Sequence, residues 1–254
     1  MTAESKLNTI VNHMLRSVQN AKAYTEPFSH CYFENFFPPE IYAEMRSHFP
    51  ADSLYKDLKH RDANRPDGTS SRKVLPFNDE KLATLDEKDQ EFWQLIRSAF
   101  NDPRLKEAMF DKLSHDLKKK TGSKNPAEVT AYPKGGLFRD LSGYKILPHK
   151  DAPRKLVTTQ FYLPEDDSQK DFGTSLYTRS LMGRLRHELN KIGVKSDKPV
   201  YERVKTFPFM PNTGYAFVVS DKSWHGREPI PDGFGDRYSL MNIYYSNPNE
   251  KFYD

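Results

Sequence analysis

Apolar residues in the first half of the chain recur at the spacing of amphipathic helices. The region from Glu87 to Lys120 carries two such stripes, and Asn101-Asp102-Pro103 separates them because proline interrupts a helix interior. The opening segment shows the same spacing at Leu7, Ile10, Val11, Met14, Leu15 and Val18. These patterns predict a mostly helical N-terminal part over residues 1–125.

The pattern changes from Val129 onward, where short stretches rich in β-branched and aromatic residues end at breakers. We predict a jelly-roll core over residues 126–250, interrupted at about 180–198 by a basic helical insertion. The whole chain, 1–254, is expected to form one α+β domain: a double-stranded β-helix, cupin-like, braced on one face by the N-terminal helices. The expected strands include 142–148, 155–164, 214–219 and 237–245.

Two N-terminal segments fall outside the helical stripes. Tyr32 to Glu40 has the pattern of an extended segment that meets a helix entered through proline. The polar tract from Lys56 to Ser71 is typical of a loop, which either covers a site as a lid or lies plainly on the surface.

Composition narrows the class of protein. The single cysteine, Cys31, excludes an intramolecular disulfide. No stretch has the length of a membrane span and the N-terminus lacks the pattern of a signal peptide, so we expect a cytoplasmic protein without a membrane partner. The net charge of +4 is mild, and the Lys118–Lys120 run lacks interleaved aromatic residues. It is typical of a solvated helix end, so no nucleic-acid partner is expected.

The candidate chemistry lies in His149-Lys150-Asp151 and in His225, which follows His149 by 76 positions. Side chains alternate along an extended segment, so His149 and Asp151 project to the same side and could hold one metal ion. Two imidazoles and one carboxylate on one face of an octahedral ion leave three positions open. That arrangement suits non-haem iron(II), which binds a co-substrate and dioxygen.

Each of these residues also has an ordinary structural interpretation. His149 could be a loop histidine beside Pro148, and Asp151 could form a turn. His225 could pack beside Trp224. The metal site is favoured because several such coincidences would have to occur in order.

Further motifs follow in a fixed order: Gly173 to Tyr177, then Ser220 to His225, then Arg237 to Leu240. Together with His-x-Asp, this order resembles the 2-oxoglutarate- and Fe(II)-dependent dioxygenases, and within them the prolyl-hydroxylase-like branch. The resemblance covers roughly residues 129–247 and implies that His149, Asp151 and His225 are the metal ligands. It is specific for the superfamily but not for a substrate.

The resemblance also implies contacts with 2-oxoglutarate. Arg237 would pair with its distal carboxylate, and a guanidinium fork suits a carboxylate on physical grounds as well. Ser239 would assist Arg237. The remaining expected contacts are Tyr162, Thr158 on the same strand face, and Tyr132, although the loop between Tyr132 and His149 is longer than in the family.

The carboxylate of Asp151 bears on the reaction. Related iron halogenases have a small residue at this position, so its retention implies hydroxylation or another oxidation that starts at a C–H bond. The implied cofactors are Fe(II), 2-oxoglutarate and O2, with release of succinate and CO2.

Basic residues near the expected pocket suggest a small, anionic substrate, although scattered solvated charges are the alternative. A peptide substrate, as for prolyl hydroxylases, is the main rival function. A jelly roll without activity that serves as a binding module is the rival of another class. The oligomeric state is left open. The basic residues concerned are Arg72, Arg139, Lys150, Arg154 and Lys155.

Overall fold

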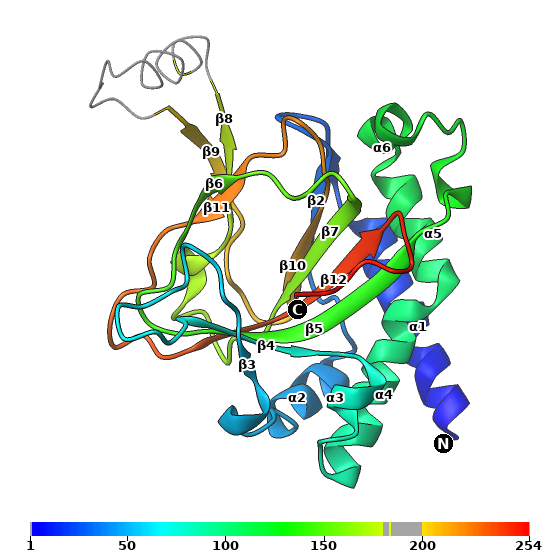
Figure 1. Cartoon of the computed structure of the whole chain (residues 1–254). Coiled ribbons are helices and arrows are strands. Elements are labelled where there is room, and N and C mark those ends of the chain that lie inside the picture. Colours follow the sequence, from blue (N-terminus) through cyan, green and yellow to red (C-terminus); the bar gives the residue numbers. More distant parts are fainter. Residues whose placement is uncertain (1, 180–182, 184–199, 254) are drawn as a thin grey trace.

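The computed structural model describes residues 2–179, 183 and 200–253. Within these residues the chain forms six α-helices (Figure 1). They are α1 (Ala3–Asn20), α2 (Pro39–Ser47), α3 (Asp79–Leu82), α4 (Glu87–Asn101), α5 (Pro103–Lys112) and α6 (Ser114–Thr121).

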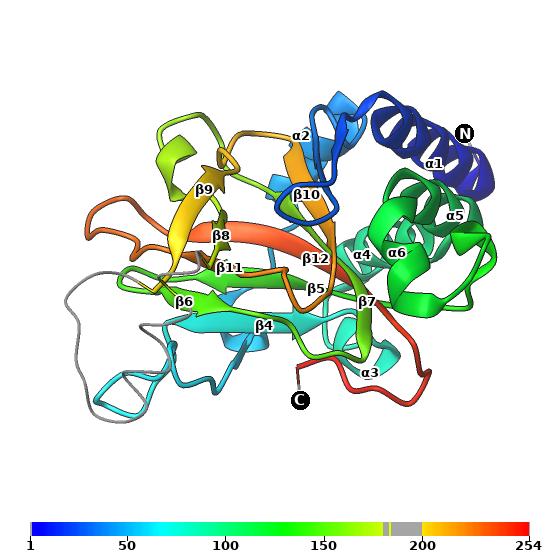
Figure 2. The same cartoon turned by 90° about the horizontal axis from the view of Figure 1, so that it is seen from above.

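The strands of the described residues form two antiparallel sheets (Figures 1 and 2). The major sheet has the order β1-β2-β10-β7-β12-β5-β4-β3, and the minor sheet has the order β6-β11-β8-β9. The strands are β1 (Ala23–Tyr24), β2 (His30–Phe33), β3 (Lys56–Asp57), β4 (Arg72–Pro76), β5 (Tyr132–Asp140), β6 (Ile146–His149), β7 (Lys155–Tyr162), β8 (Ser175–Thr178), β9 (Glu202–Thr206), β10 (Thr213–Val218), β11 (His225–Arg227) and β12 (Arg237–Tyr245).

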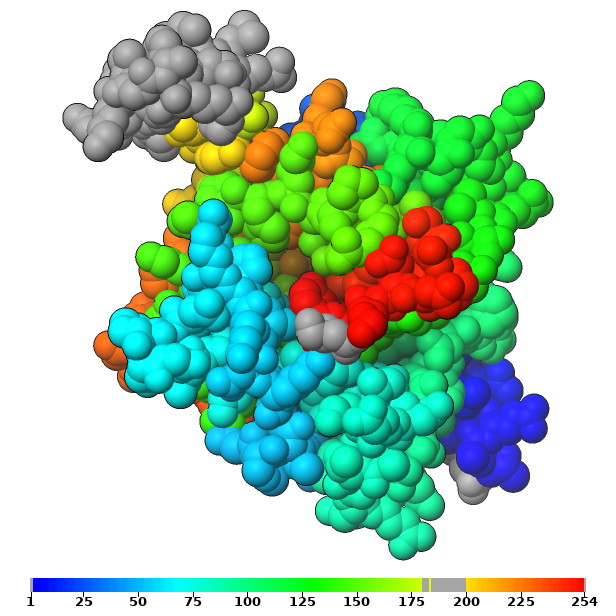
Figure 3. Space-filling view, viewed as in Figure 1, coloured from blue at the N-terminus to red at the C-terminus, as the bar shows by residue number. Residues whose placement is uncertain are grey.

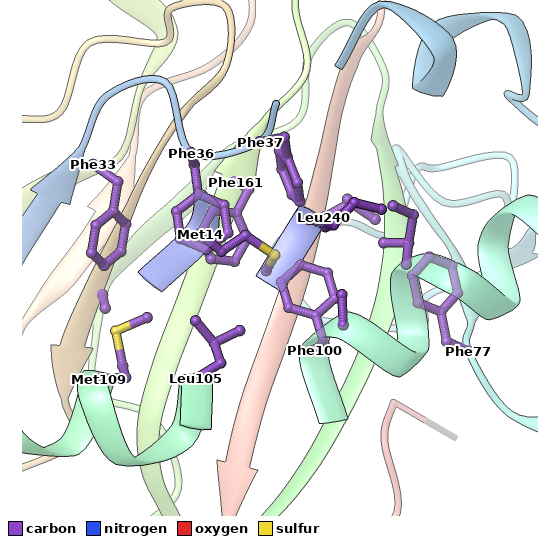
Figure 4. Close-up of a cluster of buried hydrophobic side chains, with 14 of the residues drawn as sticks. Met14, Phe33, Phe36, Phe37, Phe77, Phe100, Leu105, Met109, Phe161 and Leu240 are labelled. Carbon is purple, nitrogen blue, oxygen red and sulfur yellow. The ribbon is translucent and has the colours of Figure 1, made fainter. Parts of the chain in front are cut away.

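Helices α1, α4 and α5 cover the outer face of the major sheet, and the apolar core lies between them and the strands (Figures 1 and 4). Phe161 of β7 lies near the centre of this core, with the rings of Phe36 and Phe100 at 4.0 and 5.4 Å between centroids. Met14 of α1 and Leu240 of β12 join the same cluster. Burial of so many large apolar side chains is the main stabilising contribution to the fold.

Strand β7 shows how the sheet separates two environments. Val157 and Phe161 face the helices, whereas Thr158 and Gln160 line a cavity on the other face. This is the period-2 alternation of a strand with both faces buried, one against an apolar layer and one around polar groups. The strand therefore connects the stabilising core to the candidate site.

The helical boundaries follow from local sequence. Asp102 caps α5 by accepting a hydrogen bond from the Arg104 backbone N–H, and Pro103 occupies the first turn. The second predicted helix is divided at Leu113, where φ is −101° and ψ is 17°. Leu113 and Leu117 both remain buried in the core, so the apolar period continues across the break and conceals it.

The predicted fold class, an antiparallel jelly roll with helices on one face, is confirmed. The N-terminal part also supplies β1 to β4, which are two to five residues long and too short to show alternation clearly. The helical insertion predicted at about 180–198 lies outside the described residues, apart from Gly183. In the part of the chain that the structure describes, no helix combines the length and apolar character needed to cross a membrane.

Candidate active site

A cavity of about 260 Å³ lies between the inner faces of the two sheets. Figure 3 shows a hollow in the surface bordered by the segment near residue 60, the segment near residue 150 and the C-terminal segment. Leu58 and His60 line the cavity from the first of these, Ala152 from the second and Tyr253 from the third. The polar tract that the sequence predicted as a loop therefore contributes to the border of the cavity.

His149, Asp151 and His225 meet on one wall of this cavity. His149 ends β6 and His225 begins β11, and the two residues are directly paired across the minor sheet. One ligand atom from each of the three side chains lies within 4.8 Å of the others. Three donors at such separations could hold one metal ion, and they are the three residues for which the sequence predicted that role.

The imidazole rings are oriented by backbone carbonyls. Nδ1 of His149 lies 3.0 Å from the Leu147 carbonyl oxygen, and Nδ1 of His225 lies 3.0 Å from that of Ser223. A carbonyl only accepts, so each Nδ1 carries the proton and each Nε2 keeps its lone pair for a metal. Burial and the neighbouring His225 lower the pKa of His149 to about 3, and burial lowers the pKa of His225. Both rings are therefore neutral at pH 7.

Asp151 is held by two side chains from β7. The Lys155 ammonium lies 2.6 Å from Oδ1, and the Thr158 hydroxyl donates to Oδ2 at 2.7 Å. Burial acts to raise the pKa of Asp151, but Lys155 and His225 hold it below its usual range. The carboxylate is therefore charged, as a metal ligand must be.

Gly226 allows the minor sheet to bring its ligands together. A Cβ atom at this position would lie 2.7 Å from the Ile146 carbonyl oxygen, so a larger residue would push β11 away from β6. His225 and Arg227, on either side of Gly226, both line the cavity. The His-Gly-Arg sequence thus places an imidazole and a guanidinium on the same face.

A cluster of buried charges lies on the neighbouring wall. Arg72 and Arg237 are both paired in register with Asp140 across three adjacent strands, β4, β5 and β12. Arg237 Nη1 donates to Asp140 Oδ2 at 2.7 Å, and Arg227 Nη2 lies 3.6 Å from the same oxygen. Burial acts to raise the pKa of Asp140, but the three arginines hold it below its usual range.

Arg237 has one edge of its guanidinium free for a ligand. Its Nε and Nη2 atoms are buried and have no hydrogen-bond partner among the described residues. The guanidinium lies over the rings of Phe209 and Tyr162, at 4.3 and 5.0 Å from their centroids. Tyr162 does not line the cavity, and its hydroxyl accepts a hydrogen bond from the Thr174 backbone N–H. It is therefore placed to support Arg237 from behind.

Ser239 belongs to a buried polar network on the same inner face. Its hydroxyl accepts a hydrogen bond from the Gln160 amide at 2.8 Å, and Tyr215 donates to the carbonyl oxygen of that amide at 2.7 Å. Gln160, Tyr215 and Thr174 line the cavity, whereas Ser239 lies behind Gln160. The network fixes the orientation of the amide that faces the ligand space.

The other predicted site residues lie at or beyond the rim. Lys150 lines the cavity but rests over the Trp224 ring and pairs with exposed Asp221. Arg139 pairs with Asp52 and Asp236, and Arg154 pairs with Glu250. Arg139, Arg154 and Tyr132 do not line the cavity. Arg72, in contrast, is buried within it.

The cavity is also lined by polar residues that the sequence analysis did not select, among them Asp140, Tyr144, Gln160 and Arg227. For Arg227 a signal existed, because it follows His225 by two positions and shares its strand face. For Asp140 the signal is the sheet register, which the sequence does not contain.

No protein-family model matches this sequence, and no curated protein matches it. Among solved structures, a prolyl-4-hydroxylase from Pseudomonas putida is 14% identical, with a TM-score of 0.52 over 92% of this chain and 99% of that chain. A prolyl hydroxylase from Trichoplax adhaerens, in complex with a hypoxia inducible factor peptide fragment, is 14% identical, with a TM-score of 0.51 over 95% and 91%.

A third solved structure comes from a biosynthetic enzyme. The non-haem alpha-ketoglutarate-dependent carbocyclase SnoK of nogalamycin biosynthesis is 12% identical, with a TM-score of 0.51 over 94% of this chain and 85% of that chain. At these identities the likeness is one of fold. The chain therefore has the fold of the 2-oxoglutarate-dependent oxygenases that its motifs resemble.

Proposed function

We propose that this protein is a 2-oxoglutarate- and Fe(II)-dependent dioxygenase that hydroxylates a C–H bond of a small, anionic metabolite. The observation that carries this proposal is the convergence, in one cavity, of His149, Asp151 and His225 with the free edge of Arg237. Two neutral imidazoles with free Nε2 atoms and one charged carboxylate fit Fe(II). A buried guanidinium edge without a partner fits a carboxylate.

The roles of the residues follow from this fit. His149, Asp151 and His225 would hold Fe(II), and Arg237 would hold the distal carboxylate of 2-oxoglutarate. When bound, these groups supply the oxidising chemistry that consumes O2, releases succinate and CO2, and oxidises the substrate C–H bond. Thr158 and Lys155 orient Asp151, and the surrounding protein keeps bulk water out of a largely buried site.

Two kinds of enzyme among the similar structures differ in what they would need from the cavity. One prolyl hydroxylase was solved with a peptide fragment, and SnoK belongs to nogalamycin biosynthesis. Here three buried arginines line a cavity of about 260 Å³. A small molecule that carries negative charge complements such a cavity better than a proline side chain does.

The experiment that tests the proposal is an anaerobic titration of metal-free protein with Fe(II) and then with 2-oxoglutarate. We expect the weak visible charge-transfer band of a chelated Fe(II)–2-oxoglutarate complex in the wild type. His225→Ala should lose it and should bind Fe(II) at least about a thousandfold more weakly, because one of three protein ligands is removed. His115→Ala, which changes an exposed histidine on α6, is the matched control and should keep the band.

A second variant tests the co-substrate anchor. Arg237→Gln should weaken 2-oxoglutarate binding about a hundredfold while Fe(II) affinity stays nearly unchanged, because only the carboxylate partner is lost. If wild type and Arg237→Gln bound 2-oxoglutarate with equal affinity, another residue would hold the distal carboxylate. Absence of the band in the wild type would support a jelly roll that acts as a binding module.

A further inference from the structure

The charge cluster around Asp140 contains more positive charge than 2-oxoglutarate alone requires. Arg72, Arg227 and Arg237 are at most 9% exposed, and Asp140 is fully buried. Three guanidinium groups beside one carboxylate leave two uncompensated positive charges in this part of the cavity. The Lys155–Asp151 pair, which also lines the cavity, is neutral as a pair.

Loading the site as proposed does not remove this excess. The two negative charges of 2-oxoglutarate would be balanced by the two positive charges of Fe(II). Two buried positive charges would remain without a counter-charge, which is costly in a low-dielectric site. A further anion is therefore needed to balance these two charges. The substrate is the one ligand of the proposed reaction that has no binding residues assigned yet, so it is the candidate for this anion.

The three arginines lie over different aromatic rings, and Arg72 also contacts the Phe138 ring, at 4.5 Å from its centroid. Arg237 rests on Phe209 and Tyr162, whereas Arg72 and Arg227 both rest on the Tyr144 ring, at 5.0 and 4.6 Å from its centroid. Tyr144 also binds both: Arg72 Nη1 donates to its hydroxyl at 2.5 Å, and Arg227 Nη2 donates to its backbone carbonyl at 3.2 Å. Arg72 and Arg227 thus share a support, Tyr144, that differs from the support of Arg237.

This pair has donors left for a ligand. Arg227 Nη1 is buried and has no hydrogen-bond partner among the described residues. Arg72 Nη2 has a thioether, Met241 Sδ, at 3.5 Å, which is a weak acceptor. Arg72 Nε lies 3.2 Å from Asp140 Oδ1, an ion-pair distance without the alignment of a hydrogen bond. Both guanidinium groups line the cavity that contains the three metal-type ligands.

We infer that Arg72 and Arg227 form an anion subsite that holds a carboxylate or phosphate group of the substrate, while Arg237 holds the co-substrate. The inference rests on the proposed function and gives it a substrate class: a small molecule with an oxyanion group. Tyr144 positions the two guanidinium groups. Asp140 pairs with all three arginines and compensates one of their three positive charges.

The test is a calorimetric titration of the protein loaded with Ni(II) and 2-oxoglutarate, with inorganic phosphate and, separately, with acetate. We expect wild type to bind at least one of these anions, and the tighter one identifies the group that the subsite prefers. In Arg72→Gln and in Arg227→Gln its affinity should fall about tenfold or more, because a charged fork is lost. The affinity for 2-oxoglutarate should fall clearly less, because Arg237 keeps its hydrogen bond to Asp140 and its free Nε and Nη2 atoms.

Arg104→Gln is the matched control, since it removes an arginine that is exposed on α5 and paired with Asp102. Arg72→Lys and Arg227→Lys keep the charge and lose the fork, so they provide the test if a glutamine variant does not fold. Anion affinity that is equal in wild type and in all these variants would overturn the inference and would indicate binding at the metal.

A parallel loss of 2-oxoglutarate affinity would also overturn it, because the three arginines would then act as one co-substrate anchor. The two proposals fail in different ways. If wild type shows no charge-transfer band, the proposed function fails, whereas phosphate binding to metal-free protein that depends on Arg72 would still show the subsite.

Discussion

The two faces of the major sheet are made by the same strands and have opposite chemistry. On β7, Val157 and Phe161 pack against helices, while Thr158 and Gln160 face the cavity. Both faces are buried, so solvent exposure does not distinguish them. What distinguishes them is how the side chains are stabilised: those of the outer face by apolar packing, and the polar ones around the cavity by hydrogen bonds and ion pairs.

The two faces differ in what a substitution costs. The outer face can lose a contact without leaving a polar group unpaired, so the cost of a substitution there is a cavity. On the inner face, the charged and polar side chains around the cavity depend on one another, and removal of one partner leaves the other one buried alone. Variants on the two faces should therefore fail in different ways.

The largest effect on folding is expected on the outer face. Phe161→Ala should lower the free energy of unfolding by about 4 kcal/mol, because it removes a ring that is stacked among several phenylalanines. The Fe(II) affinity of the folded protein should change by less than roughly twofold, since the ligands lie on the other side of the sheet. Chemical denaturation followed by circular dichroism, and metal titration without denaturant, measure the two quantities.

Phe234→Ala serves as the control, because Phe234 is 46% exposed and its loss should cost less than about 0.5 kcal/mol. If metal affinity fell in parallel with stability in Phe161→Ala, the two faces would be coupled, and the comparison would be wrong.

The next largest effect is expected on the inner face. Asp140→Asn should lower the free energy of unfolding by about 3 kcal/mol at pH 7, because it leaves three buried guanidinium groups without a counter-charge. The double variant Arg72→Gln/Asp140→Asn should lose less than the sum of the single losses, since each change relieves part of the other. Strict additivity in this double-mutant cycle would show that the cluster is not one electrostatic unit.

The contribution of Asp140 to stability should depend on pH. The three arginines hold the pKa of folded Asp140 below its ordinary value of 3.8. The stability from this group is therefore complete above pH of about 4 and is lost as the pH falls through the folded value. The stability difference between wild type and Asp140→Asn should shrink below pH of about 4. A difference that stayed constant down to the lowest pH at which the protein folds would assign the effect to shape rather than charge.

The inner-face cluster also shows which site residues can be predicted from the sequence and which cannot. The spacing within one segment makes His149 and Asp151 candidate ligands from the sequence alone, and the motif order, which resembles a known family, does the same for Arg237. Asp140 joins Arg72 and Arg237 only through the register of β4, β5 and β12. Residues far apart in sequence and paired through a sheet leave no local pattern, so their grouping required the structure.

The long elements of the fold, in contrast, could be predicted from the sequence. Long helices and strands carry enough periodic positions to identify them, as for α1 and β12. Two-residue strands such as β1 and β3 exist because neighbouring strands offer free backbone groups, and their own sequence does not specify them. The division of the predicted helix at Leu113 was missed because the apolar period continues across it.

The smallest effect tests whether the inner face positions its ligands or only surrounds them. The Thr158 hydroxyl donates to Asp151 Oδ2 at 2.7 Å, and Lys155 holds the other carboxylate oxygen. Thr158→Val keeps the β-branched shape and removes only the hydroxyl, so the free energy of unfolding should change by about 1 kcal/mol. Fe(II) affinity should fall about tenfold, because a ligand that is free to rotate must be ordered on binding.

Thr159→Val is the matched control. Its hydroxyl donates to the Asn242 carbonyl, and Thr159 does not line the cavity. Thr159→Val should lower the free energy of unfolding about as much as Thr158→Val does, and its Fe(II) affinity should equal that of wild type. If both variants bound Fe(II) equally, the Thr158 hydroxyl would contribute to packing only, and Lys155 alone would orient Asp151. If Thr158→Val alone binds iron weakly, the inner face holds its ligands in place by the same hydrogen bonds that satisfy its buried polar groups.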